Sequence, residues 1–168
     1  MIASQVVAKL HKVPVFHGLT DEEKNDLFGI AEEISVEKGN AIFAEGAPGD
    51  ALFVILEGQV EVTKKGQTLA KVQEGSVLGE MALIGSTGTR SATAQAVTEV
   101  KVVKLSTARF QKLIATDHVS ALKVVANLAH VMCKRLMAMD ERLVEALSKG
   151  KKDGELQDFQ KILSNWSF

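Results

Sequence analysis

The sequence predicts an α+β fold: a small antiparallel β-roll or jelly-roll barrel, flanked by N-terminal helices and followed by a long C-terminal helix of the dimerisation type. Two observations predict it. From residue 34 to residue 105, short β-rich runs are separated by glycines, with turn signals about every 8–12 residues. On both sides of that region, apolar residues instead recur at helical spacing.

Residues 1–32 are predicted to be helical. A first apolar run at helical spacing ends at Pro14, because proline cannot continue a helix. The run consists of Val6, Val7, Leu10 and Val13. Thr20 followed by Glu23 is a capping-box pattern, so a second helix is expected over TDEEKNDLFGIAEE.

The β region contains seven short runs in which the apolar period changes to two. They are ISVEKG, AIFAEG, ALFVILEG, QVEVTKKG, TLAKVQEG, SATAQAV and EVKVVKL. Glycines at the joints, such as Gly58 and Gly66, are expected to be turn residues with positive φ. Closely spaced short strands of this kind are typical of a barrel or jelly roll.

After residue 106 the pattern is helical again. Ser106 or Thr107 is expected to cap a short helix over STARFQKLI, and a long helix is expected over residues 119–147. The long helix carries a heptad seam, formed by Leu122, Val125, Ala129, Met132, Leu136, Met139, Leu143 and Ala146. Further apolar residues outside the seam widen the apolar surface of the helix. The helix therefore needs two separate surfaces to pack against. The helix is expected to pack on its own barrel and to form a homodimer; the alternative is a single helix buried entirely in its own fold.

The chain is predicted to consist of one domain, residues 1–147, followed by a linker and a short amphipathic tail, residues 148–168. The linker SKGKKDG is charged and contains glycine. In the tail one helical face gathers Leu156, Phe159, Leu163 and Trp166. The tail is expected either to dock on the body or a partner, or to be a frayed end.

Composition excludes several classes of function. A net charge of −1 and a pI near 6.4 give no basic field for DNA or an anionic membrane. The only cysteine, Cys133, forms no internal disulfide, and no apolar run reaches the roughly 20 residues that span a bilayer. We expect a cytoplasmic protein.

No catalytic chemistry is expected. All four histidines, His11, His17, His118 and His130, lie outside the β region, so a catalytic metal on the strands is not predicted. Nucleophile–histidine–acid sets, a Walker loop and a dinucleotide fingerprint are also missing from the sequence. We therefore expect neither an enzyme nor a bound cofactor.

One stretch does suggest a binding site: LGEMALIGSTGTRSATAQA, residues 78–96. Gly79 lets the backbone pass close to a ligand, and a helical turn beginning near Glu80 would point its N–H groups at an anion. Arg90 offers a planar fork for phosphate oxygens, and Ser91 adds a hydroxyl. Glu80 accepts hydrogen bonds and so suits a sugar hydroxyl. A phosphate and a ribose hydroxyl together describe a nucleoside monophosphate.

GEMAL followed by TRSATA resembles the phosphate-binding cassette of cyclic nucleotide-binding domains, the sensor module of the bacterial catabolite activator and of cyclic nucleotide-dependent kinases and channels. PVFHGLTDEEKNDL, GDALFVILEGQVEV and EGSVLGEMAL also resemble the family, so the resemblance covers residues 10–147.

The resemblance implies a role for each cassette residue. Arg90 would bind the cyclic phosphate with support from Ser91, and Glu80 would bind the ribose 2′-hydroxyl. The backbone amides of Met81 and Ala82 would complete the phosphate cradle beside Gly79. The residues implied near the base or the helix contact are Val62, Leu69, Ala70, Val72, Arg135, Met139 and Asp140. Arg135 would either pair with Glu80 or be an ordinary charge on the helix surface. In the activator type, the helix positions that correspond to Met139 and Asp140 carry hydroxyl residues, so this chain differs there.

The chain also departs from the activator type after residue 147, because the remaining residues are too few for a winged helix-turn-helix. We therefore expect no DNA binding. The leading hypothesis is a stand-alone, dimeric receptor for a cyclic mononucleotide that reports to a separate, unknown protein effector. The ligand expected is cAMP rather than cGMP, on resemblance alone. The alternative is a scaffold or interaction module that has kept the fold and lost the ligand.

Overall fold

The structure is a computed structural model that describes residues 4–84 and 88–149. The chain forms two compact units, Met1–Ala129 and His130–Phe168. The predicted linker and tail from residue 150 onward lie outside the described residues.

The N-terminal region begins with helix α1, Ser4–Leu10, the short 3-10 helix η1, Pro14–Phe16, and helix α2, Asp21–Gly29. The prediction that helix extends through residue 32 is wrong at its end. Strand β1 already starts at Ala31, which pairs with Leu105 of the last strand. Tertiary pairing therefore overrides the helix-forming glutamates at this boundary.

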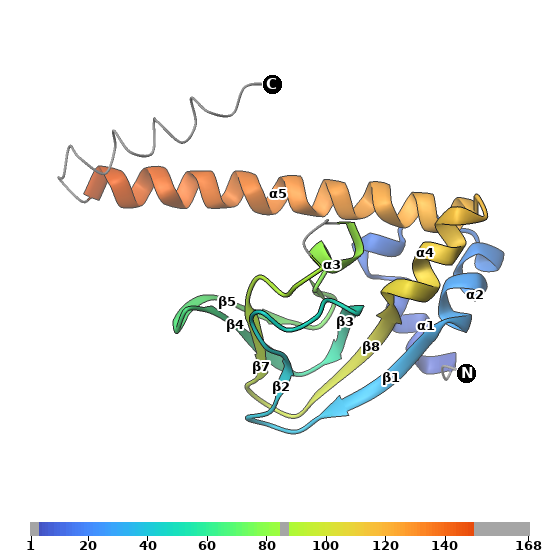
Figure 1. Ribbon diagram of the computed structural model, residues 1–168, viewed down its shortest axis with the longest axis horizontal. Helices are drawn as coiled ribbons and strands as arrows, with labels where there is room; N and C mark the ends of the chain where they lie inside the picture. Colours follow the sequence, from blue (N-terminus) through green and yellow to red (C-terminus); the bar gives the residue numbers. More distant parts are fainter. Residues whose placement is uncertain (1–3, 85–87, 150–168) are drawn as a thin grey trace. The chain divides into compact units, whose positions relative to one another are not determined.

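The β region folds into two four-stranded antiparallel sheets, in the orders β1-β8-β3-β6 and β2-β7-β4-β5 (Figure 1). The strands are β1 Ala31–Val36, β2 Ala41–Phe43, β3 Ala51–Glu57, β4 Gln59–Lys64, β5 Gln67–Gln73, β6 Val77–Leu78, β7 Thr93–Ala96 and β8 Val100–Ser106. Each of the seven predicted runs contributes a strand, which confirms the β-roll. Strand β6 was not predicted, because two residues are too short to show a period.

Strand β3 is apolar from Ala51 to Leu56, as expected for a strand with both faces buried. Leu52 and Val54 pack in a cluster with residues of α1, α2 and α4, which gather at one end of the β1–β8 sheet (Figure 1). The alternate residues Phe53 and Ile55 pack in a second cluster between the two sheets. The second cluster forms the interior of the roll, where the candidate site lies.

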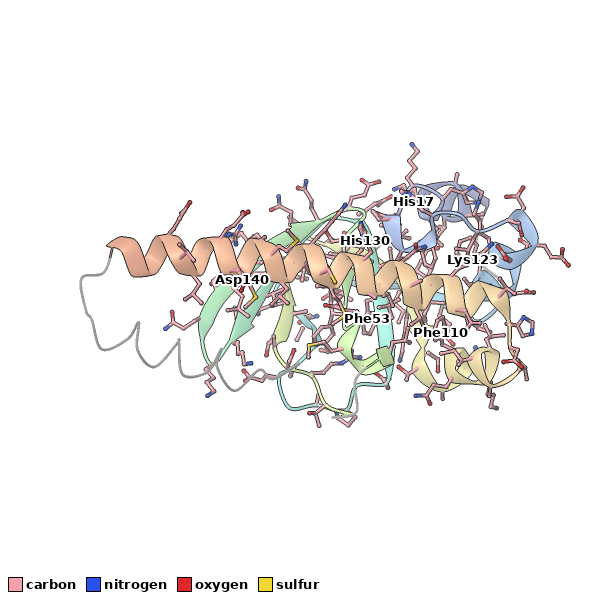
Figure 2. All side chains as sticks on the ribbon, turned by 90° about the horizontal axis from the view of Figure 1, so that it is seen from above. His17, Phe53, Phe110, Lys123, His130 and Asp140 are labelled. Atoms are coloured by element: carbon pink, nitrogen blue, oxygen red, sulfur yellow. The ribbon has the colours of Figure 1, made fainter. Side chains whose placement is uncertain are left out.

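The C-terminal helices are α4, Thr107–Ala115, and α5, Val119–Lys149. Val124 and Leu128 on the first turns of α5 are fully buried in the helical cluster. Asn127 donates to the carbonyls of Val15 and His17, so this part of α5 is also hydrogen-bonded to the N-terminal segment (His17 is labelled in Figure 2).

Much of the remaining apolar surface of α5 faces solvent. Leu122 is 51% exposed, although Val124 and Leu128 nearby are buried. The other large exposed apolar side chains of the helix are Val119, Leu136, Met137, Met139 and Val144. The alternative of a helix buried entirely in its own fold is therefore wrong for the start of α5, where Val119 and Leu122 are exposed. None of the helices in the described part of the chain is long and apolar enough to cross a membrane.

Helix α2 starts with the predicted capping box. The Thr20 hydroxyl accepts from the Glu23 N–H, and the Glu23 carboxylate accepts from the Thr20 N–H. Lys123 of α5 also donates to Glu23 at 2.8 Å. The hydrogen bond from Lys123, with that from the Thr20 backbone, lowers the pKa of the Glu23 carboxyl.

A matched pair of capping variants tests this arrangement. Thr20→Ala is expected to lower the free energy of unfolding by about 1 kcal/mol, because the helix loses its side-chain cap. Ser106 occupies the same position in α4 but makes no side-chain capping bond. Ser106→Ala is therefore expected to change stability by less than about 0.5 kcal/mol. Urea denaturation of both variants measures the difference, and equal losses would contradict the capping box.

Candidate functional site

The segment after β6 turns sharply at Gly79 and forms the one-turn helix α3, Met81–Ile84. The predicted helical turn after Gly79 is thus confirmed. Gly79 has φ +73°, and a Cβ at this position would collide with the Arg90 guanidinium and approach the Ala51 carbonyl oxygen to 3.0 Å. Only glycine lets the backbone turn this close to the arginine.

Arg90 is the central residue of the site. It is 4% exposed, and its Nη1 donates to the carbonyls of Ala51, at 2.8 Å, and Gly79, at 3.4 Å. Its Nη2 donates to a carboxylate oxygen of Asp50 at 3.1 Å. The Arg90 Nε is buried, and none of the described residues accepts a hydrogen bond from it. Buried donors are nearly always paired, so the unpaired Nε–H of Arg90 is a candidate contact for an acceptor on a ligand.

Asp50 is shared between two cations. One of its oxygens accepts from Arg90 and the other accepts from Lys104 of β8 at 3.0 Å. The hydrogen bond from Lys104 lowers the pKa of the Asp50 carboxyl, and the charge of Arg90 adds to that shift. Burial lowers the pKa of the Arg90 guanidinium, whereas Asp50 and Glu80 oppose that change. Asp50 and Arg90 thus form an ion pair in which the arginine side chain is buried.

Backbone hydrogen bonds fix the strand-like segment that carries Arg90. The Arg90 N–H donates to the Ala47 carbonyl at 2.8 Å, and the Arg90 carbonyl accepts from Gly46 at 2.9 Å. Gly49 donates to the Gly88 carbonyl at 2.8 Å. The loop before β3 and the segment before β7 are therefore paired with each other.

The other predicted cassette residues surround α3. Glu80 is half-buried, whereas Ser91 is exposed and its hydroxyl lies 3.4 Å from the Met81 sulfur. The Ala82 N–H donates to the Gly79 carbonyl at 3.1 Å. Gly79, Glu80 and Arg90 are thus brought together, while the Ala82 amide is engaged within the turn.

Four cross-strand partners form a row across the second sheet. Phe43 of β2 pairs with Ala94 of β7, Ala94 pairs with Val62 of β4, and Val62 pairs with Ala70 of β5. Directly opposed residues present their side chains to the same face of a sheet. The row therefore runs from Phe43, beneath Arg90, to Ala70, one of the residues predicted to lie near a base.

The remaining predicted base residues on β5 differ from one another. Val72 pairs with Val60 and packs against the second cluster. Leu69 is the additional residue at a β-bulge, because Ala70 pairs with Val62 and Thr68 pairs with Thr63. Leu69 is consequently 53% exposed.

Arg135, Met139 and Asp140 lie on α5 within the second unit. Met139 and Asp140 are exposed there, and Arg135 is half-buried. Contacts of these residues with a ligand or with Glu80 stay predictions.

Four residues around Arg90 were not predicted from the sequence: Asp50, Lys104 and the two aromatic residues Phe43 and Phe53. Asp50 follows a glycine directly before an apolar strand, which is a weak signal for a functional loop. Its pairing with a residue forty positions away has no sequence signature. Within residues 4–84 and 88–149, no group of three or more His, Cys, Asp or Glu is placed to hold a metal ion.

Comparison with known proteins gives the same assignment as the cassette. The family model for the cyclic nucleotide-binding domain matches residues 33–117. A cAMP-dependent protein kinase regulatory subunit from Yarrowia lipolytica is 37% identical over 65% of this chain and 30% of its own length. The cyclic AMP receptor protein of Thermus thermophilus is 32% identical over 77% of this chain and 60% of its own length. The chain therefore spans less than two thirds of either relative.

Solved structures agree with this assignment. A cyclic nucleotide-binding domain from Methylobacillus flagellatus KT superposes with a TM-score of 0.77 at 26% identity, covering 84% of both chains. The family is defined by ligand binding rather than by catalysis. Its model spans seven of the eight strands in full, together with the buried arginine and the turn that packs on it. The protein therefore belongs to the cyclic nucleotide-binding domain family.

Proposed function

We propose that this protein binds a cyclic mononucleotide with its phosphate against Arg90. The observation that carries the proposal is the buried Nε of Arg90, which has no acceptor among the described residues. Nη1 already donates to Ala51 and Gly79, and Nη2 donates to Asp50. An anion at the Nε-side edge would accept a charge-assisted hydrogen bond from the unpaired Nε–H.

Other cassette residues complete the proposed site. Glu80 would accept a hydrogen bond from the ribose 2′-hydroxyl, and Ser91 would support the phosphate. The Met81 amide would donate to the phosphate directly. The Ala82 amide would do so only after releasing the Gly79 carbonyl, to which it donates in this structure.

The base is proposed to lie along the β4–β5 side of the roll. Val62 and Ala70 stand in the same cross-strand row as Phe43, so they extend the site away from Arg90 on the same face of the sheet. Val72 and Leu69 would border the base there. The preference for cAMP over cGMP is proposed on resemblance to the activator type alone.

The proposed output is a change in the arrangement of helix α5. Ligand would favour the arrangement in which Arg135, Met139 and Asp140 meet the base, because only that state offers the additional contacts. The exposed apolar residues of α5, among them Leu122 and Leu136, are proposed to form a homodimer. A separate protein effector in the cytoplasm would detect the change.

Competitive calorimetric titration with cAMP and cGMP, followed by sizing with and without ligand, tests this function. Ligand at about 100 times its dissociation constant is expected to add about 2.7 kcal/mol to stability, which a thermal shift detects. No binding of either nucleotide would favour a scaffold that keeps the fold without the ligand. A monomer in both states would contradict the homodimer while leaving the receptor intact.

A further inference from the structure

The guanidinium of Arg90 lies against two aromatic rings. Its Cζ is 4.4 Å from the ring centroid of Phe43 and 5.4 Å from that of Phe53 (Phe53 is labelled in Figure 2). The two ring centroids are 5.7 Å apart, and the ring planes are inclined by 31°. Phe43 comes from β2 and is half-buried, whereas Phe53 comes from β3 and is buried.

The rings and the hydrogen bonds act on different parts of Arg90. Asp50 and the Ala51 carbonyl accept from the terminal nitrogens and so fix that end of the guanidinium in its plane. The Phe43 ring covers a face, where a cation is attracted by the ring quadrupole and water is excluded. Together they leave the Nε-side edge as the unoccupied part of a buried cation.

The position of Phe43 in the sheet explains why its ring can lie against the Arg90 guanidinium. Its directly opposed partner on β7 is Ala94, a small and fully buried residue. Ala94 therefore places only a methyl group beside Phe43 on that face of the sheet. The backbone hydrogen bond from Arg90 to Ala47 holds the arginine beside the segment that follows β2.

We propose that Phe43 is a positioning residue for the phosphate site: it holds the Arg90 guanidinium in the binding orientation before any ligand arrives. This rests on the proposed function, because it assigns a task within the same site. Ordering a long side chain on binding weakens affinity. A guanidinium already ordered and dehydrated by Phe43 avoids that loss when the phosphate binds.

The first measurement needs no ligand. The Arg90 Nε–H signal in nitrogen-15 NMR spectra reports solvent exchange and the ring current of Phe43. Phe43→Leu is expected to accelerate Nε–H exchange at least tenfold and to remove the ring-current shift. Phe43→Tyr keeps the ring and is expected to retain both. Unchanged exchange in Phe43→Leu would overturn the proposal.

The second measurement is affinity for cAMP. Phe43→Leu is expected to weaken binding about five- to tenfold, the range of a partly buried cation–π contact. In an Arg90→Ala background the same substitution is expected to change affinity by less than twofold, because Phe43 acts through Arg90. Equal losses in both backgrounds, or none in the native one, would show that Phe43 does not position the arginine for binding.

Two controls separate positioning from stability. Phe53→Leu removes a buried ring farther from the guanidinium, so it should lower the melting temperature more than Phe43→Leu but lower affinity less. Pentafluorophenylalanine at position 43 keeps the ring shape while inverting its quadrupole. It should weaken binding as Phe43→Leu does, even if the leucine variant folds poorly; native affinity with this residue would overturn the proposal.

The two proposals fail in different ways. If the native protein binds neither cAMP nor cGMP, the proposed function is wrong, and the ligand-free exchange measurement still decides whether Phe43 orders Arg90. If the native protein binds and Arg90→Ala does not, but Phe43→Leu binds normally, the receptor stands and the positioning role is wrong.

Discussion

Arg90→Ala is expected to weaken binding of the cyclic nucleotide by about 2–4 kcal/mol, or roughly 30- to 700-fold. The substitution removes the charge-assisted hydrogen bonds to the phosphate and leaves that anion in a poorly hydrated site. It also removes the donor to the Ala51 carbonyl and one of the two cations at Asp50. Isothermal titration calorimetry at fixed ionic strength measures the loss.

Arg109→Ala is the matched control for this loss. Arg109 is an exposed arginine whose guanidinium lies 3.7 Å from the exposed carboxylate of Glu32. Its removal deletes the same charge from the surface and is expected to leave affinity within about twofold, since exposed pairs contribute little. Near-native affinity in Arg90→Ala would remove this arginine from the site. Denaturation curves of both variants check that the affinity is measured on folded protein.

Gly58→Ala is expected to lower the free energy of unfolding by about 2–4 kcal/mol. Gly58 joins β3 to β4 with φ +89°, a conformation that side-chain-bearing residues rarely adopt. A Cβ there would also collide with the Glu99 carbonyl oxygen and lie 2.8 Å from the Thr98 hydroxyl. Urea denaturation at several protein concentrations measures the loss independently of dimerisation.

Gly66→Ala separates the two causes. Gly66 also has positive φ, +76°, but a Cβ there meets nothing within 4 Å. This substitution is expected to destabilise by only about 1 kcal/mol, the strain of the left-handed backbone alone. If Gly58→Ala had no greater effect, the crowding by the turn at Thr98 and Glu99 would be unimportant.

Local patterns in the sequence predict most of the elements. The apolar run ALFVIL, the alternation in QVEVTK and the glycines after them predict β3, β4 and the turn between them. Thr20 and Glu23 predict the start of α2, because capping depends on residues three apart. The end of α2 is not predicted, since it depends on β1 pairing with β8, some seventy residues farther along.

The candidate site shows the same division. Gly79, Glu80 and Arg90 are predicted because they belong to one short motif. Asp50 and Phe43 are not, because their contacts with Arg90 arise only when the loop before β3 and the strand β2 fold against the segment before β7. The exposed position of Leu69 depends on a bulge in the pairing of β4 with β5, which the alternation of apolar residues does not reveal.

The pairing of the loop at residues 46–49 with the segment at residues 88–90 has a mechanical consequence. Because Arg90 is hydrogen-bonded through both its N–H and its carbonyl, its backbone cannot be displaced without carrying that loop along. The loop ends at Asp50, whose carbonyl accepts from the N–H of Thr107, the first residue of α4. We therefore expect a displacement of the Arg90 backbone to be transmitted, through residues 46–50 and the hydrogen bond between Asp50 and Thr107, to the first residue of α4.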